Sequence, residues 1–260
     1  MSQFIKDKYG VLGQIQPDGS IEGGDSACWQ GHLVYLSDEE FAYVDFFEVS
    51  PGAYVRHPIP SATNNSFGSY YKNPWCGCMS RDQLTGVVGA LVKQKEYMAM
   101  LRLIAHFYLR GFVLTYNTLP NGAPPAEMKF SLIRLFKPIK GERYWKLPDL
   151  FLFDMWATVL RGFGKASWIF FPLLCVLDIH TLLNTVLVVN RSDDNDKINY
   201  AMKLFVSRDY VPTPVSWLSL KLLNLERLLG NIQSYWCNWR QQPGMYPLYV
   251  ERFKKLGKTL

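Results

Sequence analysis

Apolar residues recur every three or four positions along much of the chain, which is the spacing of amphipathic helices. The clearest run covers residues 81–110, where the polar stretch 93–96 separates two apolar patterns and predicts two consecutive helices. Strand patterns are scarce, and only residues 53–55 and 113–116 favour brief pairing. About ten helices with alternating short and long connections predict an all-α fold of packed helical hairpins.

Further helices are predicted from apolar spacing and from helix-start signals. The sequence Ser-Asp-Glu-Glu at residues 37–40 has the pattern of a capping box and predicts a helix that continues to Phe47. Asp25 is a candidate N-cap for the helix before it. The remaining predicted helices cover residues 26–36, 147–160, 166–177, 179–189, 199–207, 215–229, 232–239 and 249–256.

Two long segments lack helical spacing. Residues 49–79 contain four prolines, and residues 117–146 are rich in Pro, Gly and basic residues. Loops of this length in a compact domain usually carry function or pack over another element. No stretch has the composition of a linker, so we expect residues 1–260 to form a single α-helical domain with two long irregular loops.

The composition is that of a folded chain without a metal or cofactor motif. Of 260 residues, 48% are hydrophobic and 19% are charged, which excludes intrinsic disorder. The five cysteines lack regular spacing, and Cys76 and Cys78 are separated by a single residue, closer than in zinc knuckles, so we expect reduced thiols and no metal site. The chain has no nucleotide-binding glycine loop, His-Glu-x-x-His or Gly-x-Ser-x-Gly sequence, and we expect no cofactor.

The net charge of +6 conceals an asymmetry between two parts of the chain. Residues 1–60 carry three Lys/Arg against nine Asp/Glu, a local charge of −6, whereas residues 61–260 carry 25 against 13, a local charge of +12. This split favours a first segment that docks on the rest or builds an acidic site. Basic residues cluster between 129 and 146, but without a nucleic-acid motif they predict a solvated surface and no specific nucleic-acid partner.

Residues 166–190 are long enough to raise the question of a membrane span. Asp178, His180 and Asn184 fall in the middle of this stretch, where charge is costly in lipid. We therefore expect two buried helices joined near Asp178 and no membrane partner. The first residues lack the apolar segment of a secretory signal, so a cytoplasmic location is expected, or a virion-associated one if the protein is viral.

Three clusters in the first third of the chain are candidates for chemistry. The first covers residues 18–31, in which glycines alternate with Glu22 and Asp25 before Trp29. Glycines let the backbone approach a ligand closely, and the carboxylates lie near an indole in the sequence. The competing interpretation is a Gly-rich turn in which Asp25 caps the next helix.

The second cluster is the tripeptide Arg-His-Pro at residues 56–58. Arg56 suits a carboxylate or sugar hydroxyls, and His57 titrates near neutral pH, as a general acid or base requires. An ordinary surface histidine in a loop is the simpler interpretation. The third cluster, Ser-Arg-Asp-Gln at residues 80–83, begins a helix, where exposed N–H groups keep a carboxylate ionised.

Together with the helical hairpins that follow, three motifs resemble those of (α/α)-toroid proteins: Gly-Asp-Ser-x-x-Trp-x-Gly at residues 24–31, Arg-His-Pro at 56–58 and Ser-Arg-Asp-Gln at 80–83. Many glycoside hydrolases and polysaccharide lyases use that architecture, and the motifs also resemble uncharacterised bacterial and phage proteins. The resemblance covers residues 18–83. A complete toroid usually needs a longer chain than 260 residues, so the resemblance implies a toroid-like and incomplete fold.

The resemblance implies a protein that binds or cleaves a polysaccharide or another glycan, in a cleft lined by the loops before the inner helices. In a hydrolase or lyase version, Asp25 and Asp82 are the acid–base carboxylates, and His57 could replace either one. The side chains that the resemblance implies in substrate binding are Trp29, Arg56 and Arg81. Tyr54 and Trp75 lie near these motifs in the sequence as aromatic contacts.

Two other interpretations stay open. A non-enzymatic structural or host-interaction protein, viral or carried by a virion, would present aromatic-rich helices to a protein partner. An exposed patch of Trp236, Trp239 and Tyr246 would favour this interpretation. A membrane-associated helical protein would depend on residues 166–190 and on the basic C-terminal tail.

Overall fold

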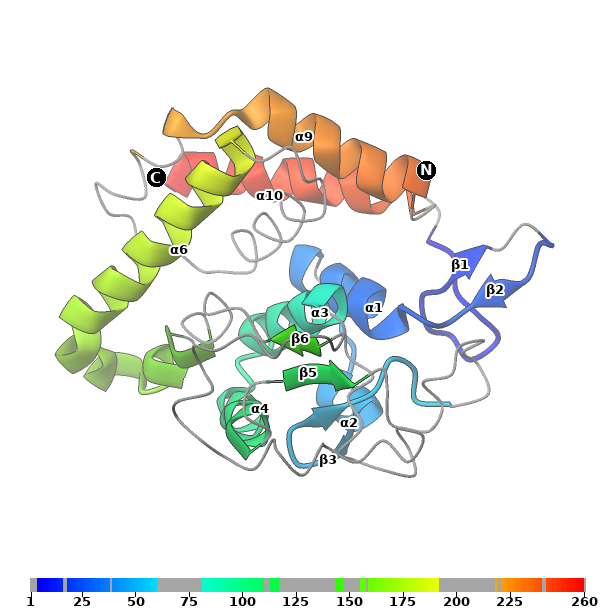
Figure 1. Ribbon diagram of the computed structural model, residues 1–260, viewed down its shortest axis with the longest axis horizontal. Coiled ribbons are helices and arrows are strands. Elements are labelled where there is room, and N and C mark those ends of the chain that lie inside the picture. Colours follow the sequence, from blue (N-terminus) through cyan, green and yellow to red (C-terminus); the bar gives the residue numbers. More distant parts are fainter. Residues whose placement is uncertain are drawn as a thin grey trace.

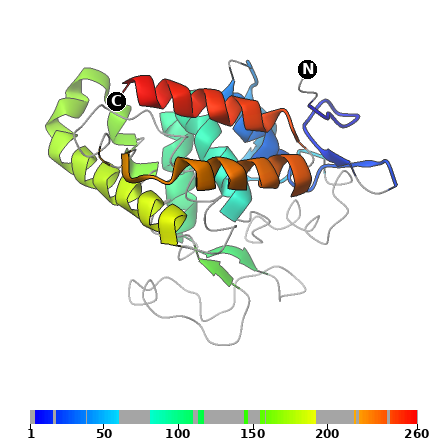
Figure 2. The same cartoon turned by 90° about the horizontal axis from the view of Figure 1, so that it is seen from above.

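The computed structural model describes residues 4–15, 18–37, 39–59, 81–109, 113–116, 144–146, 155–157, 159–191, 218, 221–239 and 242–259. Within these residues the protein is mostly helical (Figures 1 and 2). The α-helices are α1 (Ser26–Leu36), α2 (Tyr43–Phe47), α3 (Arg81–Lys93), α4 (Tyr97–Leu109), α6 (Phe171–Arg191), α9 (Leu225–Gln233) and α10 (Met245–Thr259). A 3-10 helix, η5 (Gly164–Phe170), precedes α6, and a π-helical segment, η6 (Ser234–Trp239), continues α9.

Three small antiparallel sheets accompany the helices in the described part of the chain, so the all-α prediction is correct only in that helices dominate. The pairs are β1 (Gln14–Ile15) with β2 (Ile21–Glu22), β3 (Glu48–Ser50) with β4 (Ala53–Tyr54), and β5 (Val113–Tyr116) with β6 (Tyr144–Lys146). Both predicted strand segments are strands, and each pairs with its own partner. Gly52 makes the β3–β4 turn possible because it has φ +74°, a conformation that glycine adopts without strain.

Helix α1 lies at the centre of the packing. All of its residues from Ser26 to Tyr35 are buried, which is typical of a core helix with no solvated face. Ala27 and Val34 pack into one hydrophobic cluster with α3 and α4, whereas Trp29 and Leu33 pack into a second cluster with α9, η6 and α10. Figure 1 shows α1 between α3 and the pair α9–α10.

Helices α1 and α3 touch backbone to backbone where two glycines meet. A Cβ atom built on Gly31 would lie 2.2 Å from the carbonyl oxygen of Gly86, and one built on Gly86 would lie 2.4 Å from the carbonyl oxygen of Cys28. Real Cβ atoms do not approach other atoms this closely. The close crossing therefore requires glycine at both positions, and it fixes the start of α3 beside the start of α1.

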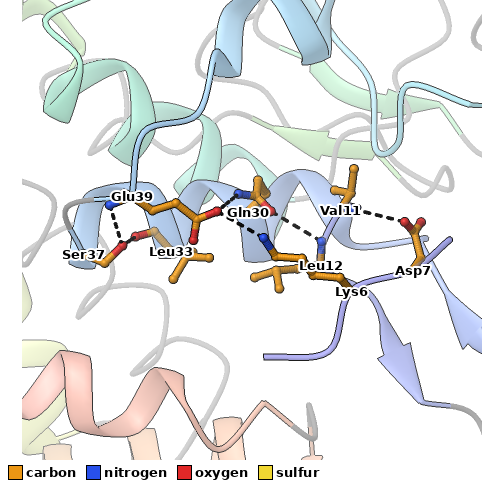
Figure 3. Close-up of polar contacts among 8 residues, drawn as sticks. All are labelled: Lys6, Asp7, Val11, Leu12, Gln30, Leu33, Ser37 and Glu39. Atoms are coloured by element: carbon orange, nitrogen blue, oxygen red, sulfur yellow. Dashed lines mark hydrogen bonds and ion pairs between the residues drawn. The ribbon is translucent and has the colours of Figure 1, made fainter. Parts of the chain in front are cut away.

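The N-terminal segment packs along α1 through the buried side chain of Gln30 (Figure 3). Gln30 Oε1 accepts a hydrogen bond from the backbone N–H of Leu12 at 3.4 Å, and Gln30 Nε2 donates to Glu39 Oε1 at 3.4 Å. Lys6 forms an ion pair with the same carboxylate oxygen at 3.5 Å. One buried amide thus holds the chain before α1 and the chain after it.

The charge asymmetry favoured a first segment that docks on the rest of the chain or builds an acidic site, and β3 supplies a contact of the first kind. Glu48 accepts hydrogen bonds from the guanidinium of Arg102 on α4, with Arg102 Nε 2.8 Å from Glu48 Oε1. Hydrogen bonding to Glu48 raises the pKa of Arg102 above its usual value. Glu48 Oε1 also accepts from the backbone N–H of Gly52 at 2.6 Å, so this carboxylate fixes the β3–β4 turn as well.

The two-helix prediction for residues 81–110 is confirmed. Helix α3 ends at Lys93 and α4 begins at Tyr97, at the predicted polar break. Lys95, in the connection, has φ +59°, which an α-helix does not allow, so the two helices cannot merge.

The helix predicted for residues 37–47 is wrong at its start, because α2 covers only Tyr43–Phe47. The Ser37 hydroxyl donates to the carbonyl oxygen of Leu33 at 2.6 Å, and the Ser37 N–H donates to the same oxygen at 3.0 Å. Ser37 therefore ends α1 instead of beginning the next helix. The capping-box pattern gave a wrong helix start because the serine hydroxyl donates to a carbonyl of the preceding helix.

The prediction of two buried helices joined near Asp178 is also wrong. Helix α6 is continuous through that position, from Phe171 to Arg191, because Pro172 lies in its first turn, where proline is tolerated, and no later residue breaks it. Among the side chains of α6 that the structure describes, Leu174, Leu177, Val186 and Val189 are buried and apolar, whereas Phe171, Leu173, Val176, Leu183 and Leu187 are exposed. Within the described residues, none of the helices has the length and apolar character that a bilayer crossing requires.

Candidate functional site

The three sequence motifs meet at the residue pair Gly24–Asp25. Arg56 Nη1 donates to the Gly24 carbonyl oxygen at 3.2 Å and lies 3.3 Å from Asp25 Oδ1. Gln83 Nε2 donates to the same two oxygens, at 2.8 Å and 2.9 Å. One carbonyl and one carboxylate from the first motif thus bind a guanidinium from the second and an amide from the third. We call Asp25, Arg56 and Gln83 the motif junction.

The backbone around α1 explains why the Asp25 side chain can serve this junction. The predicted side-chain cap does not form, because Asp25 makes no side-chain capping bond to α1. The Ala27 N–H donates instead to the carbonyl oxygen of Arg56 at 2.8 Å, and the Ser26 N–H donates to the carbonyl of Gly23 at 3.1 Å. A carbonyl group of the second motif therefore accepts one of the N–H groups at the start of α1. The Asp25 carboxylate instead bonds to the side chains of Arg56 and Gln83.

The motif junction lies at the boundary between the core and solvent. The side chains of Asp25 and Arg56 are 20% and 13% exposed, whereas Gln83 is fully buried. Donation by a guanidinium and by an amide stabilises the anionic form of a carboxylate. In its ionised form, Asp25 only accepts hydrogen bonds.

Gln83 supplies a feature that analysis of the sequence did not assign to the site. Both Gly24 O and Asp25 Oδ1 are acceptors, so the Gln83 atom that faces them must be the NH₂ group. Its Oε1 is then buried, and no described residue donates a hydrogen bond to it. Buried acceptors normally have a partner in the protein, in water or in a ligand. The sequence signal was the glutamine of the Ser-Arg-Asp-Gln motif, which a capping box would direct to its own helix.

His57 lies beside Arg56 in the sequence but is bonded to a different group. His57 Nε2 lies 2.7 Å from Asp7 Oδ2, and His57 Nδ1 accepts the backbone N–H of Ile59 at 3.0 Å. The imidazole is therefore the neutral form with its proton on Nε2. Asp7 is fixed in turn, because its Oδ1 accepts the N–H groups of Tyr9 and Val11, at 2.8 Å and 3.1 Å.

These contacts give His57 a structural role. Its ring is fully buried and both nitrogens are engaged, so neither nitrogen is available to exchange a proton with a ligand. Together with Asp7 it holds the second motif against the N-terminal turn. Asp7 was not singled out in the sequence, where only its place at the start of Asp-Lys-Tyr-Gly, residues 7–10, marks it as a turn residue.

Two of the three predicted aromatic contacts have no exposed ring face. Trp29 and Tyr54 are buried in the second and the first hydrophobic cluster, respectively, so neither presents a ring face to a ligand. Burial also raises the pKa of the Tyr54 hydroxyl well above its usual value. Trp75 lies outside the described residues.

Two further predicted residues are placed by their backbone alone. Arg81 and Asp82 are the first two residues of α3, directly before Gln83, and their side chains lie outside the described part of the structure. The first turn of α3 therefore borders the motif junction. Of the three residues predicted to form an exposed partner patch, Trp236 is fully buried in the second cluster and Tyr246 is half-buried, and the side chain of Trp239 lies outside the described part of the structure.

Among the described residues, no group of three or more His, Cys, Asp or Glu side chains is arranged to hold a metal ion. Cys28, Cys175 and Cys237 are not in disulfide bonds. Comparison of the chain with protein-family models, with curated proteins and with solved structures gives no match. The geometry of the motif junction is therefore the feature from which a function can be inferred.

Proposed function

We propose that the protein is a carbohydrate-active or carbohydrate-binding helical protein whose glycan site is the motif junction. The observation that carries this proposal is a partly exposed carboxylate, Asp25, held between the guanidinium of Arg56 and the amide of Gln83. Sugar hydroxyls both donate and accept hydrogen bonds. A partly exposed carboxylate next to a partly exposed guanidinium offers an acceptor and a donor to such hydroxyls.

The position of the junction agrees with the toroid-like fold that we propose. Loops before the inner helices line the cleft in toroid families. Here Gly24 and Asp25 directly precede α1, the most buried helix, and Gln83 lies in the first turn of α3, which crosses α1 at the paired glycines. The helices α1 and α3 would then be inner helices of the incomplete toroid.

In a hydrolytic or lyase version, the two carboxylates have different roles. Asp25 is the ionised base or nucleophile, since two donors stabilise its anion, and Asp82 in the first turn of α3 is the acid. Arg56 and Arg81 would hold the substrate. In a hydrolase, the distance between the two carboxyl groups would decide the stereochemistry at the anomeric carbon of the sugar. A separation of about 6.5–9.5 Å gives inversion of its configuration, and one of about 5–5.5 Å gives retention.

The test is a glycan screen followed by substitution of Asp25. Asp25→Asn keeps an acceptor oxygen but removes the charge, so we expect it to abolish turnover or to weaken glycan binding at least about tenfold. Asp45→Asn, on the exposed surface of α2, is the matched control and should bind as the wild type does. The proposal is overturned if no polysaccharide or oligosaccharide binds to the wild type, or if Asp25→Asn binds and reacts as the wild type does.

A non-enzymatic interaction protein is the second candidate function. It is favoured by a specific observation, namely that large apolar side chains between Phe163 and Val176 are exposed to solvent. Such a surface calls for a partner of its own, independent of the motif junction. The two functions are compatible, because the surface and the junction involve different elements.

A further inference from the structure

The 3-10 helix η5 and the first turns of α6 form an exposed apolar surface, which we call the η5–α6 surface. The exposed fractions are 73% for Trp168, 61% for Ile169, 52% for Phe171 and 61% for Val176. No residue of η5 is buried. Monomeric proteins rarely expose so many large apolar side chains together unless the surface binds something.

The geometry of η5 arranges these side chains beside a cation. A 3-10 helix has three residues per turn, so positions three apart lie on one face. Lys165, Trp168 and Phe171 are three apart, which places a basic, an indole and a phenyl side chain in one row. An aromatic row that ends in a lysine suits an interface between an apolar layer and an anionic one, because the lysine stem lies along the apolar layer while its ammonium stays polar.

The η5–α6 surface lies at one end of the molecule. Figures 1 and 2 both place the beginning of α6 at the end opposite to the β1–β2 hairpin. Asp25 follows directly on β2, so the motif junction lies toward the other end. A projecting end can contact a flat surface without interference from the rest of the protein.

Charge distinguishes between the occupants of this surface. Between Phe163 and Val176, where the exposed apolar side chains lie, Lys165 is the only charged residue of the sequence; Asp178 follows in α6, and residues 61–260 as a whole carry a local charge of +12. A second copy of the chain would bring like charges together at this contact. An anionic lipid surface instead complements the charge, and aromatic side chains favour the headgroup region of bilayers.

We propose that the protein binds the surface of an anionic phospholipid bilayer through the η5–α6 surface. Trp168, Ile169 and Phe171 enter the headgroup and upper acyl region, and Lys165 contacts the lipid phosphates and carboxylates. The helix α6 then lies on the bilayer and does not cross it. This proposal is independent of the glycan site, because it involves none of the residues of the motif junction.

The experiment is co-sedimentation of the full chain with vesicles of phosphatidylcholine plus phosphatidylserine, and with vesicles of phosphatidylcholine alone. We expect binding to the anionic vesicles that weakens as salt is added. Trp168→Glu should reduce the partition coefficient at least about tenfold, since it places a charge in the contact layer. Lys165→Glu should weaken binding to anionic vesicles and leave the weak binding to neutral vesicles unchanged.

Met98→Glu is the matched control, because Met98 is 65% exposed on α4, outside this surface. It should bind vesicles as the wild type does, and circular dichroism should give the same helical content for all three variants. The proposal is overturned if the wild type does not sediment with anionic vesicles, or if Trp168→Glu sediments with them equally well. It is also overturned if sedimentation velocity finds a dimer that Trp168→Glu dissociates, since a second copy then occupies the surface.

Discussion

The side-chain amide of Gln83 donates to the carboxylate of Asp25 at 2.9 Å, across 58 positions of sequence. The same amide nitrogen also donates to the carbonyl oxygen of Gly24 at 2.8 Å. Through this one group, the start of α3 is bonded to the start of α1. The bond orients a carboxylate at the surface from a position that is itself fully buried.

Replacing Gln83 should therefore affect both stability and ligand binding. Gln83→Leu keeps the approximate shape but removes both hydrogen bonds, so we expect a loss of about 1–3 kcal/mol in the free energy of unfolding. Urea denaturation measures this loss. Gln233→Leu, at an exposed position of α9, is the control and should change the stability by less than about 0.5 kcal/mol. Equal stability of Gln83→Leu and the wild type would mean that the amide is not holding the two helices.

Two glycine substitutions should have opposite effects on stability, one at the crossing of α1 and α3 and the other away from it. Gly86→Ala forces a Cβ to within 2.4 Å of backbone atoms of α1, so we expect it to destabilise the fold by at least about 2 kcal/mol. Gly230→Ala, at an exposed position of α9, meets open space and should stabilise the protein by about 0.5–1 kcal/mol. Thermal unfolding of the two variants provides the measurement. A neutral Gly86→Ala would contradict the close crossing.

Elements with strong local signals could be predicted from the sequence. Helix α1 has the predicted bounds, and the break between α3 and α4 falls at the predicted polar residues. In both cases the spacing of apolar residues and the residues that end a helix indicate the same helix boundaries. The start of α2 was mispredicted because the Ser37 hydroxyl donates to the carbonyl of Leu33 in the preceding helix α1. The continuity of α6 was missed because the polar residue Asp178 does not interrupt the helix.

The site was predictable only as a set of motifs. The sequence indicated that residues 24–31, 56–58 and 80–83 belong together, and the structure brings members of all three into contact. It did not indicate which side chain of each motif faces the contact. Gln83 points inward and His57 turns toward Asp7, because long-range hydrogen bonds, absent from any local pattern, decide these orientations.

The Asp7–His57 pair predicts an energetic coupling between the N-terminal turn and the second motif. His57→Ala leaves a buried carboxylate without its donor, so we expect a loss of about 1–3 kcal/mol in the free energy of unfolding. The remaining folded protein should bind glycan as tightly as the wild type. A double-mutant cycle with Asp7→Ala should give an interaction energy of at least about 0.5 kcal/mol. Additive effects on stability would show that the pair does not act as a unit.

The hydroxyls of Tyr35 on α1 and Tyr249 on α10 lie 2.8 Å apart in the second hydrophobic cluster. Burial raises the pKa of both hydroxyls well above the usual value. The unfolded chain releases these protons at about pH 10, whereas the folded core retains them. The contribution of this pair to the free energy of unfolding is therefore fully present below about pH 10 and falls as the pH rises above that value.

Urea denaturation between about pH 8 and pH 11 tests this alkaline loss. Tyr35→Phe should cost about 1–2 kcal/mol at neutral pH, because it leaves the Tyr249 hydroxyl buried without its partner, whereas Tyr35→Phe/Tyr249→Phe should cost less. The double variant should also lose less stability at alkaline pH. Some alkaline loss should remain, since burial also raises the pKa of Tyr43. An identical alkaline slope in the wild type and the double variant would contradict the role assigned to the pair.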